Sequence, residues 1–72
     1  MARQKDWTRR LVVRAFIKAY FIEHGQAPTG REIAQACHCP HGKVGGMLRD
    51  LADRGWIIYH GGYRGIELPQ RD

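Results

Sequence analysis

Hydrophobic positions along the chain predict three helices followed by a β-hairpin. The first helix covers residues 7–24, with Asp6 or Thr8 as its N-cap, and Gly25 ends it. When its residues are placed at 100° steps, one broad apolar arc is rich in aromatic side chains and is predicted to face the core. This arc comprises Val13, Phe16, Ile17, Tyr20 and Phe21.

A second arc of the same helix is also apolar, and only Arg14 and Lys18 form a polar edge. It comprises Leu11, Val12, Ala15, Ala19 and Ile22. A helix that is apolar nearly all round cannot bury every face inside a 72-residue chain. We therefore expect the second arc to form a homodimer interface, because a second copy of the chain is the simplest partner. The alternative is that the hairpin or the C-terminal residues cover it.

Residues 29–38 and 41–54 are predicted to be two helices joined by a tight turn. Thr29 is a good N-cap, and Glu32 three residues later completes a capping box. Pro40 disfavours helix in the residue before it, so the first of the two helices ends there. The second helix has an apolar stripe at helical spacing, made by Val44, Met47, Leu48 and Leu51. This arrangement predicts a helix-turn-helix, whose second helix enters the major groove of DNA.

Residues 56–68 are predicted to form a hairpin after Gly55 ends the last helix. Two strand-like runs flank a glycine-containing turn, and alternation directs Ile66, Leu68 and one of Ile57 and Ile58 inward. The predicted fold is therefore α+β: a winged helix-turn-helix with three helices and a C-terminal two-stranded β-hairpin wing. Residues 1–6 are expected to be a short, flexible basic tail.

Three stretches together resemble the N-terminal DNA-binding domain of the LexA family of SOS-response repressors. They are PTGREIAQA at 28–36, LRDLADRGWI at 48–57 and RGIEL at 64–68. The resemblance runs from about Trp7 to Leu68 and implies a winged helix-turn-helix that binds DNA. The chain departs from the family in a turn that is one residue shorter and in glycines where the recognition helix usually carries polar residues. It also has no counterpart of the family's self-cleaving protease half.

The charge balance favours a polyanionic partner, since 12 Lys and Arg against 7 Asp and Glu leave a net charge of +5. Basic residues near helix N-termini, the outward positions of residues 41–54 and the hairpin tip are the predicted DNA contacts. They are Arg9, Arg10, Thr29, Arg31, His41, Gly42, Lys43, Gly45, Gly46, Arg49, Tyr63 and Arg64. Lys43 is the best candidate for guanine acceptors or a nearby phosphate. Arg64 is expected at the minor groove, the alternative being a charge that stabilises the turn.

Glycines in the second of the paired helices require an explanation, because each costs roughly 1 kcal/mol against alanine in a helix interior. Gly42, Gly45 and Gly46 would allow bare backbone to approach a groove or a phosphate closely. A loosely formed helix start and close packing on a partner are the alternatives. Few side chains remain to read bases, so we expect modest sequence specificity with a large shape component.

Cysteines and histidines at residues 37–41 raise the question of a metal site. The C-x-C spacing with interleaved histidines is not that of structural zinc sites, and no second cluster follows in the sequence. We expect no metal and no cofactor, with Cys37 packed in the core and the other residues forming the turn.

The sequence thus predicts a double-stranded DNA-binding transcriptional regulator, a small repressor that acts as a dimer in the cytoplasm. Such a domain suits a phage, plasmid or mobile-element regulator. The alternative is a protein–protein adaptor that reuses the winged fold. An enzyme is not expected, because the chain has no serine, no paired carboxylates on one element and no phosphate-binding loop, and no small-molecule substrate is expected either. Neither a membrane-spanning run nor a signal peptide is expected.

Overall fold

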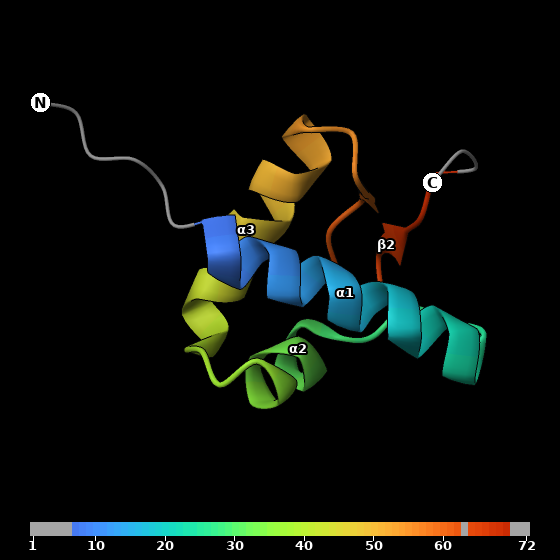
Figure 1. The fold of residues 1–72 in the computed structure, drawn as a ribbon, viewed down its shortest axis with the longest axis horizontal. Coiled ribbons are helices and arrows are strands. Elements are labelled where there is room, and N and C mark those ends of the chain that lie inside the picture. The colour runs from blue at the N-terminus through green and yellow to red at the C-terminus, as the bar shows by residue number, and fades with distance from the viewer. Residues whose placement is uncertain (1–6, 63, 70–72) are drawn as a thin grey trace, which may run out of the picture.

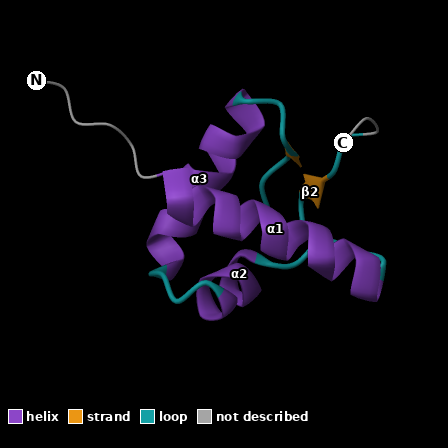
Figure 2. Cartoon of the chain, viewed as in Figure 1, coloured by secondary structure: helices purple, strands orange, loops and turns teal. Residues whose placement is uncertain are grey.

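A computed structural model of the chain describes residues 7–62 and 64–69, and it contains three helices followed by a two-stranded antiparallel sheet (Figures 1 and 2). The elements are α1 (Trp7–His24), α2 (Gly30–Ala36), α3 (His41–Asp53), β1 (Ile58–Tyr59) and β2 (Ile66–Glu67). This α+β layout, with a hairpin following the helix-turn-helix, is that of a winged helix-turn-helix, as the sequence predicts.

The two ends of α1 differ in how well the sequence predicts them. The helix ends before Gly25 as predicted, and Gly25 closes it in a left-handed conformation, with φ +71° and its N–H donating to the carbonyl of Phe21 at 2.9 Å. Thr8 lies inside the helix, which begins at Trp7, so Thr8 is not its N-cap. Asp6, the other predicted cap, lies outside the described residues.

The capping box of α2 is formed as predicted. The Thr29 hydroxyl accepts from the Glu32 N–H at 3.1 Å, and the Thr29 N–H donates to Glu32 Oε1 at 2.8 Å. The helix ends at Ala36, two residues before the predicted end, because His38 adopts φ +54°. This left-handed residue lets the Cys39 N–H donate to the carbonyl of Ala34 at 3.1 Å, which closes the helix before Pro40.

Helix α3 begins directly after Pro40, which has no side-chain cap to offer. Its C-terminal closure matches the prediction, since Gly55 has φ +78° and the Trp56 N–H donates to the carbonyl of Leu51 at 3.1 Å. The chain therefore reverses direction at Gly55 and enters the hairpin.

The hairpin has shorter strands than predicted, with Ile58 opposite Glu67 and Tyr59 opposite Ile66. Ile57 is the buried member of the isoleucine pair, and Ile58 is exposed. A Cβ at Gly65 would collide with the carbonyl of Gly61, so the turn brings two backbone segments into close contact. Glycine at position 65 is required for this reason.

The core forms where α1 crosses the α2–α3 pair and the hairpin closes over one end (Figure 1). Val13 and Ile17 of α1 are fully buried, and Ile57 and Ile66 bring the hairpin into the same cluster. The other members are Ala27, Ile33, Ala34, Cys37, Val44, Met47, Leu48 and Leu51. At the edge of this core, the rings of Trp7 and Trp56 meet edge to face with centroids 5.8 Å apart, which joins the start of α1 to the start of the hairpin.

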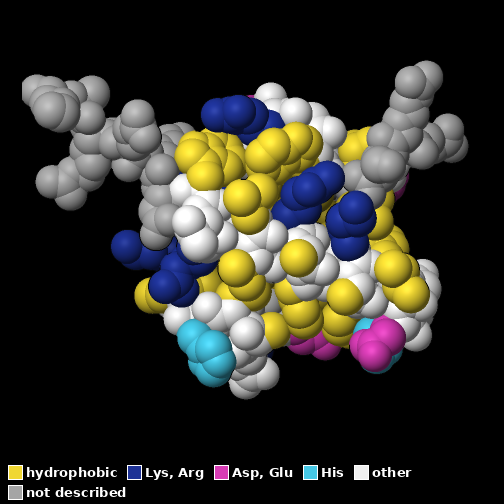
Figure 3. Space-filling view, in the orientation of Figure 1, with side chains coloured by type: hydrophobic (Ala, Val, Ile, Leu, Met, Phe, Trp, Pro, Cys, Tyr) yellow, Lys and Arg dark blue, Asp and Glu magenta, His cyan; other side chains and the backbone are white. Residues whose placement is uncertain are grey.

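The second arc of α1 is exposed along its whole length. Leu11, Val12 and Ile22 expose 44%, 52% and 84% of their surface, and Ala15 and Ala19 are exposed as well. Hydrophobic side chains accordingly gather along α1 on the face shown in Figure 3. The hairpin and the C-terminal residues up to position 69 do not cover the arc, contrary to the alternative considered from the sequence. No described helix has the length and hydropathy needed to cross a membrane.

Gly46 and Gly65 provide opposite tests of this fold. A Cβ at Gly46 would meet nothing within 4 Å, so Gly46→Ala should stabilise α3 by roughly 1 kcal/mol. We expect its thermal midpoint to rise by about 4–8 °C in a calorimetric scan. Gly65→Ala should instead lower the midpoint because of the collision with Gly61. A lower midpoint for Gly46→Ala would contradict the open surface described at this position.

Candidate nucleic-acid interface

The outward face of α3 is a nearly bare helix surface. His41, Gly42, Lys43, Gly46 and Arg49 are exposed on it, while the opposite face packs in the core. A Cβ built at any of its three glycines would meet no other atom within 4 Å. Internal packing therefore does not explain these glycines, and the backbone of α3 is accessible from outside.

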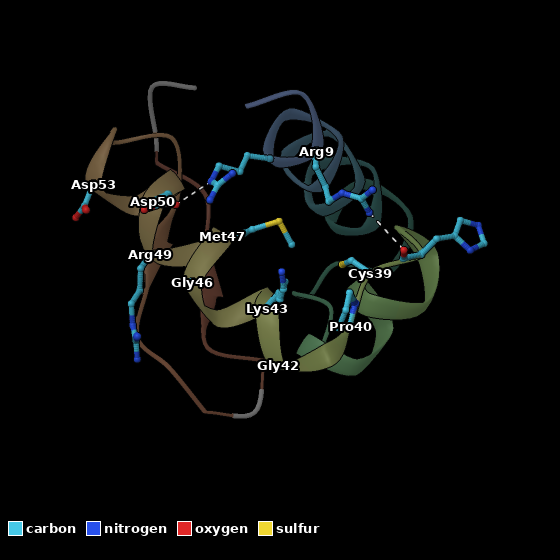
Figure 4. A pocket seen from close by; sticks show the side chains of 12 residues that line it. Arg9, Cys39, Pro40, Gly42, Lys43, Gly46, Met47, Arg49, Asp50 and Asp53 are labelled. Carbon is cyan, nitrogen blue, oxygen red and sulfur yellow. Dashed lines mark hydrogen bonds and ion pairs between the residues drawn. The ribbon is translucent and has the colours of Figure 1, made fainter. Parts of the chain in front are cut away.

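A hollow of about 920 Å³ lies on one side of this face, between the start of α1, the helix-turn-helix turn and α3 (Figure 4). Arg9 borders it from α1 and Lys43 from α3, with Met47 between them. The predicted contact residues Gly42, Gly46 and Arg49 line it too. The structure thus brings together residues that are 30 or more positions apart in the sequence.

A second hollow, of about 360 Å³, lies on the other side of α3, between this helix and the wing. Gly45 of α3 and Gly62 and Gly65 of the hairpin line it together with His41. The His41 imidazole also lies beside Gly30, with Nε2 3.4 Å from where a Cβ of Gly30 would be. Helix α3 is therefore a ridge with a hollow on each side.

Three of the predicted cationic contacts keep their charge at the surface. Arg31, Lys43 and Arg49 are exposed, and within the described residues no hydrogen bond or ion pair engages them. Lys43 and Arg49 project from the ridge itself, whereas Arg31 lies on α2 next to the capping residue Thr29. These side chains are available to bind an anion.

Arg9 and Arg10, both predicted phosphate contacts, have different surroundings. Arg9 is exposed and donates to the carbonyls of Cys37 and His38 at 3.2 and 3.3 Å, where it caps the end of α2. Arg10 is half-buried and forms an ion pair with Asp50, with Nε and Oδ2 2.8 Å apart. Its guanidinium also lies 5.3 Å from the ring centroid of Trp7. Arg10 thus joins α1 to α3 and neutralises an acidic residue of the candidate face.

Arg64 is turned toward the helices, which corrects the expectation that it reaches from the wing tip to the minor groove. Its Nη1 donates to the carbonyl of Ala27 at 2.6 Å and lies 3.3 Å from Glu32 Oε1 and 3.4 Å from the Tyr20 hydroxyl. The side chain is 22% exposed, and its backbone has φ +52°. These contacts agree with the alternative reading, in which Arg64 stabilises the turn. Tyr63, the other predicted tip contact, lies outside the described residues.

The Glu32 carboxylate accepts three hydrogen bonds in this network, from Tyr20, Thr29 and Arg64. The backbone N–H of Thr29 lowers the pKa of Glu32, and Arg64 and the Tyr20 hydroxyl, which donates to Oε2 at 3.2 Å, lower it further. Desolvation opposes this shift without reversing it. The ionised carboxylate therefore holds together the start of α2, the middle of α1 and the wing.

The two cysteines at the end of α2 differ in burial, Cys37 being buried and Cys39 partly exposed. Cys37 is buried in the core as predicted, and this burial, together with the nearby Cys39, raises the pKa of its thiol. Both thiols are free. Among the residues that the structure describes, no three His, Cys, Asp or Glu side chains lie close enough to hold a metal ion.

Comparison with known proteins adds no assignment, because neither a protein-family model nor a curated protein matches the chain. The resemblance to the LexA family therefore remains an expectation from the sequence.

Six lining residues of the larger hollow were not predicted as contacts, namely His38, Cys39, Pro40, Met47, Asp50 and Asp53. His38 is exposed at the turn in its left-handed conformation, and Asp53 ends α3 with an exposed carboxylate. The proline two positions after His38 marks the turn and is the signal that could have identified it. Asp53 limits the basic surface at this end of the helix.

The Arg64 network predicts a loss of stability when it is broken. Arg64→Ala removes a charged donor from the carbonyl of Ala27, so we expect the free energy of unfolding to fall by about 1.5–3 kcal/mol in urea titrations. Arg31→Ala is the control, because this exposed arginine has no described partner and its loss should leave stability nearly unchanged.

The same network makes the stability of the fold depend on pH. The pKa of Glu32 is lowered in the folded state. The stability that its ionised carboxylate contributes is therefore fully present above the ordinary glutamate pKa of about 4.3, and it is lost as the pH falls through the folded-state pKa. Glu32→Gln should therefore be less stable than the parent at pH 7, and the difference should close under acid. A constant difference between pH 7 and pH 2 would contradict this role for the carboxylate.

Proposed function

We propose that the chain binds double-stranded DNA and acts as a small transcriptional repressor, with α3 in the major groove. The observation that carries the proposal is the outward face of α3. Lys43 and Arg49 are exposed there without described partners, while the acidic Asp50 beside them is neutralised by Arg10. The second helix of a helix-turn-helix is the element that reads base edges.

The charge distribution supports a nucleic acid over a neutral ligand. The chain carries +5 overall, and Arg9 and Lys43 border the hollow beside α3. Contacts from lysine and arginine to phosphates supply most of the non-specific affinity of DNA-binding proteins. A surface with cationic side chains from both α1 and α3 is suited to bind the DNA backbone that runs alongside α3 when this helix lies in the groove.

Sequence reading by this surface is limited. His41, Lys43 and Arg49 are its polar readers, and the glycine positions offer only backbone. Bidentate side-chain contacts discriminate bases by about 1–3 kcal/mol each, so a few readers give modest specificity. We propose that groove shape and close backbone approach supply the remainder.

The part of the wing that is proposed to contact DNA differs from the one predicted from the sequence. Arg64 is engaged with α1 and α2, so the hairpin contact rests on the turn backbone at Gly61 and Gly62. Both glycines have positive φ, and Gly62 is exposed, so its peptide group is accessible to a phosphate.

Repression would follow from occupancy of promoter DNA, in the cytoplasm where that DNA is found. The sequence resemblance to the DNA-binding domain of LexA-family repressors supports this reading. A protein–protein adaptor is the second candidate, favoured by the exposed apolar side chains of Leu11, Val12 and Ile22. Tight capture of a protein, with no affinity for any duplex at about 50 mM salt, would favour the adaptor.

Lys43 gives the most direct test. Lys43→Gln should weaken duplex binding on the order of tenfold and reduce the slope of log affinity against log salt by about 1, because one phosphate contact is lost. Fluorescence anisotropy with a labelled duplex at several salt concentrations measures both quantities.

The matched control makes the same chemical change elsewhere. Lys18→Gln removes one positive charge from α1, outside the hollow that Lys43 borders. It should leave affinity and salt slope close to those of the parent. If both variants behave alike, the α3 face is not where the duplex binds.

Gly46→Ala is expected to change the stability of the fold and the affinity for duplex DNA in opposite directions. The variant is expected to be more stable than the parent, yet a methyl group on the outward face should hold α3 away from the groove and reduce duplex affinity. Affinity equal to that of the parent would show that the backbone of α3 does not approach the DNA closely.

A further inference from the structure

The exposed arc of α1 lies opposite the buried face of the same helix. Val13 and Ile17 point into the core, and at 100° per residue the centre of the arc lies about 170° away from them. Its large members expose 44–84% of their surface. Clustered apolar side chains on a small domain mark an interaction surface.

Four of the five residues of this arc are spaced symmetrically about Ile17, and Leu11 is the exception because its counterpart is Glu23. Ala15 and Ala19 lie two positions on either side of it, and Val12 and Ile22 lie five positions on either side. An antiparallel copy of α1, related by a two-fold axis at Ile17, would therefore place Ala15 against Ala19 and Val12 against Ile22. Each such contact occurs twice, as an isologous interface requires.

The sizes of these side chains fit a pair of crossing helices. Two packed helices are closest where their axes cross and separate toward both ends, at interaxial distances of about 8–10 Å that depend on the contacting side chains. Alanines at the centre permit the close approach, while Val12, Ile22 and Leu11 fill the wider space beyond it. A parallel pair would lose this match, because Val12 would meet Val12 and Ile22 would meet Ile22.

We propose that the chain forms a two-fold homodimer through antiparallel packing of α1 on α1. A contact between single helices buries less than the about 1,200–2,000 Å² of stable interfaces, so the dimer dissociates on dilution. Each chain carries +5, so salt strengthens this self-association by screening the repulsion. DNA binding responds to salt in the opposite direction, and the dimer does not depend on the proposed function.

Sedimentation equilibrium without DNA, from about 10 μM to 1 mM protein, tests the proposal across the micromolar to millimolar range of weak association. We expect the mass to rise toward that of a dimer and to rise further with added salt. A monomer mass throughout would overturn the proposal, whether the arc is unoccupied, is covered by residues 1–6 or binds a different protein.

Two double variants test the register. Val12→Glu with Ile22→Lys places opposite charges against each other in the antiparallel pair and keeps the central alanines, so this variant should still dimerise. Val12→Glu with Ile22→Glu places like charges together and should be monomeric at every concentration. Both positions are exposed, so the thermal midpoints of the two variants at low concentration should be similar.

Loss of dimer in both variants, or in neither, would overturn the antiparallel register. Duplex binding is measured separately with Lys43→Gln, whose substitution lies on α3 away from this arc. A failure of the dimer and a failure of DNA binding are therefore distinguishable.

Discussion

The packing of Val13 and Ile17 onto the α2–α3 pair is the contact on which the rest of the structure depends. Both side chains are fully buried, and α1 contacts both α2 and α3. A chain of about this size buries only roughly 60% of its unfolded surface, so it has a single core and little reserve of stability. Loss of this contact would leave α2 and α3 packed only on each other and on the hairpin, and it would expose the core face that α1 now covers.

Polar contacts at the edges of this core hold the elements in register. Arg10 joins α1 to α3 through Asp50, and Arg64 joins the wing to α1 and α2 through Glu32 and the carbonyl of Ala27. The basic residues therefore divide into two groups. One group stabilises the fold, and the other, which includes Lys43 and Arg49, remains exposed around α3.

Local signals made most of the fold predictable from the sequence. The capping box at Thr29, the glycine caps at Gly25 and Gly55 and the apolar stripe of α3 depend on residues close in the chain, and all are present. The early end of α2 was missed because a left-handed histidine is uncommon and has no simple sequence signal. The roles of Arg10 and Arg64 were missed because their partners lie 40 and 32 positions away, beyond the reach of local patterns.

The attachment of the wing to the helical body affects how the protein can bind any large ligand. A hairpin with two-residue strands would explore many conformations if only its own turn held it. The Arg64 contacts restrict it before binding, so little conformational entropy remains to be lost when a ligand arrives. The wing and α3 can therefore present a preorganised surface. Their relative orientation determines how wide a ligand can be and still fit between them.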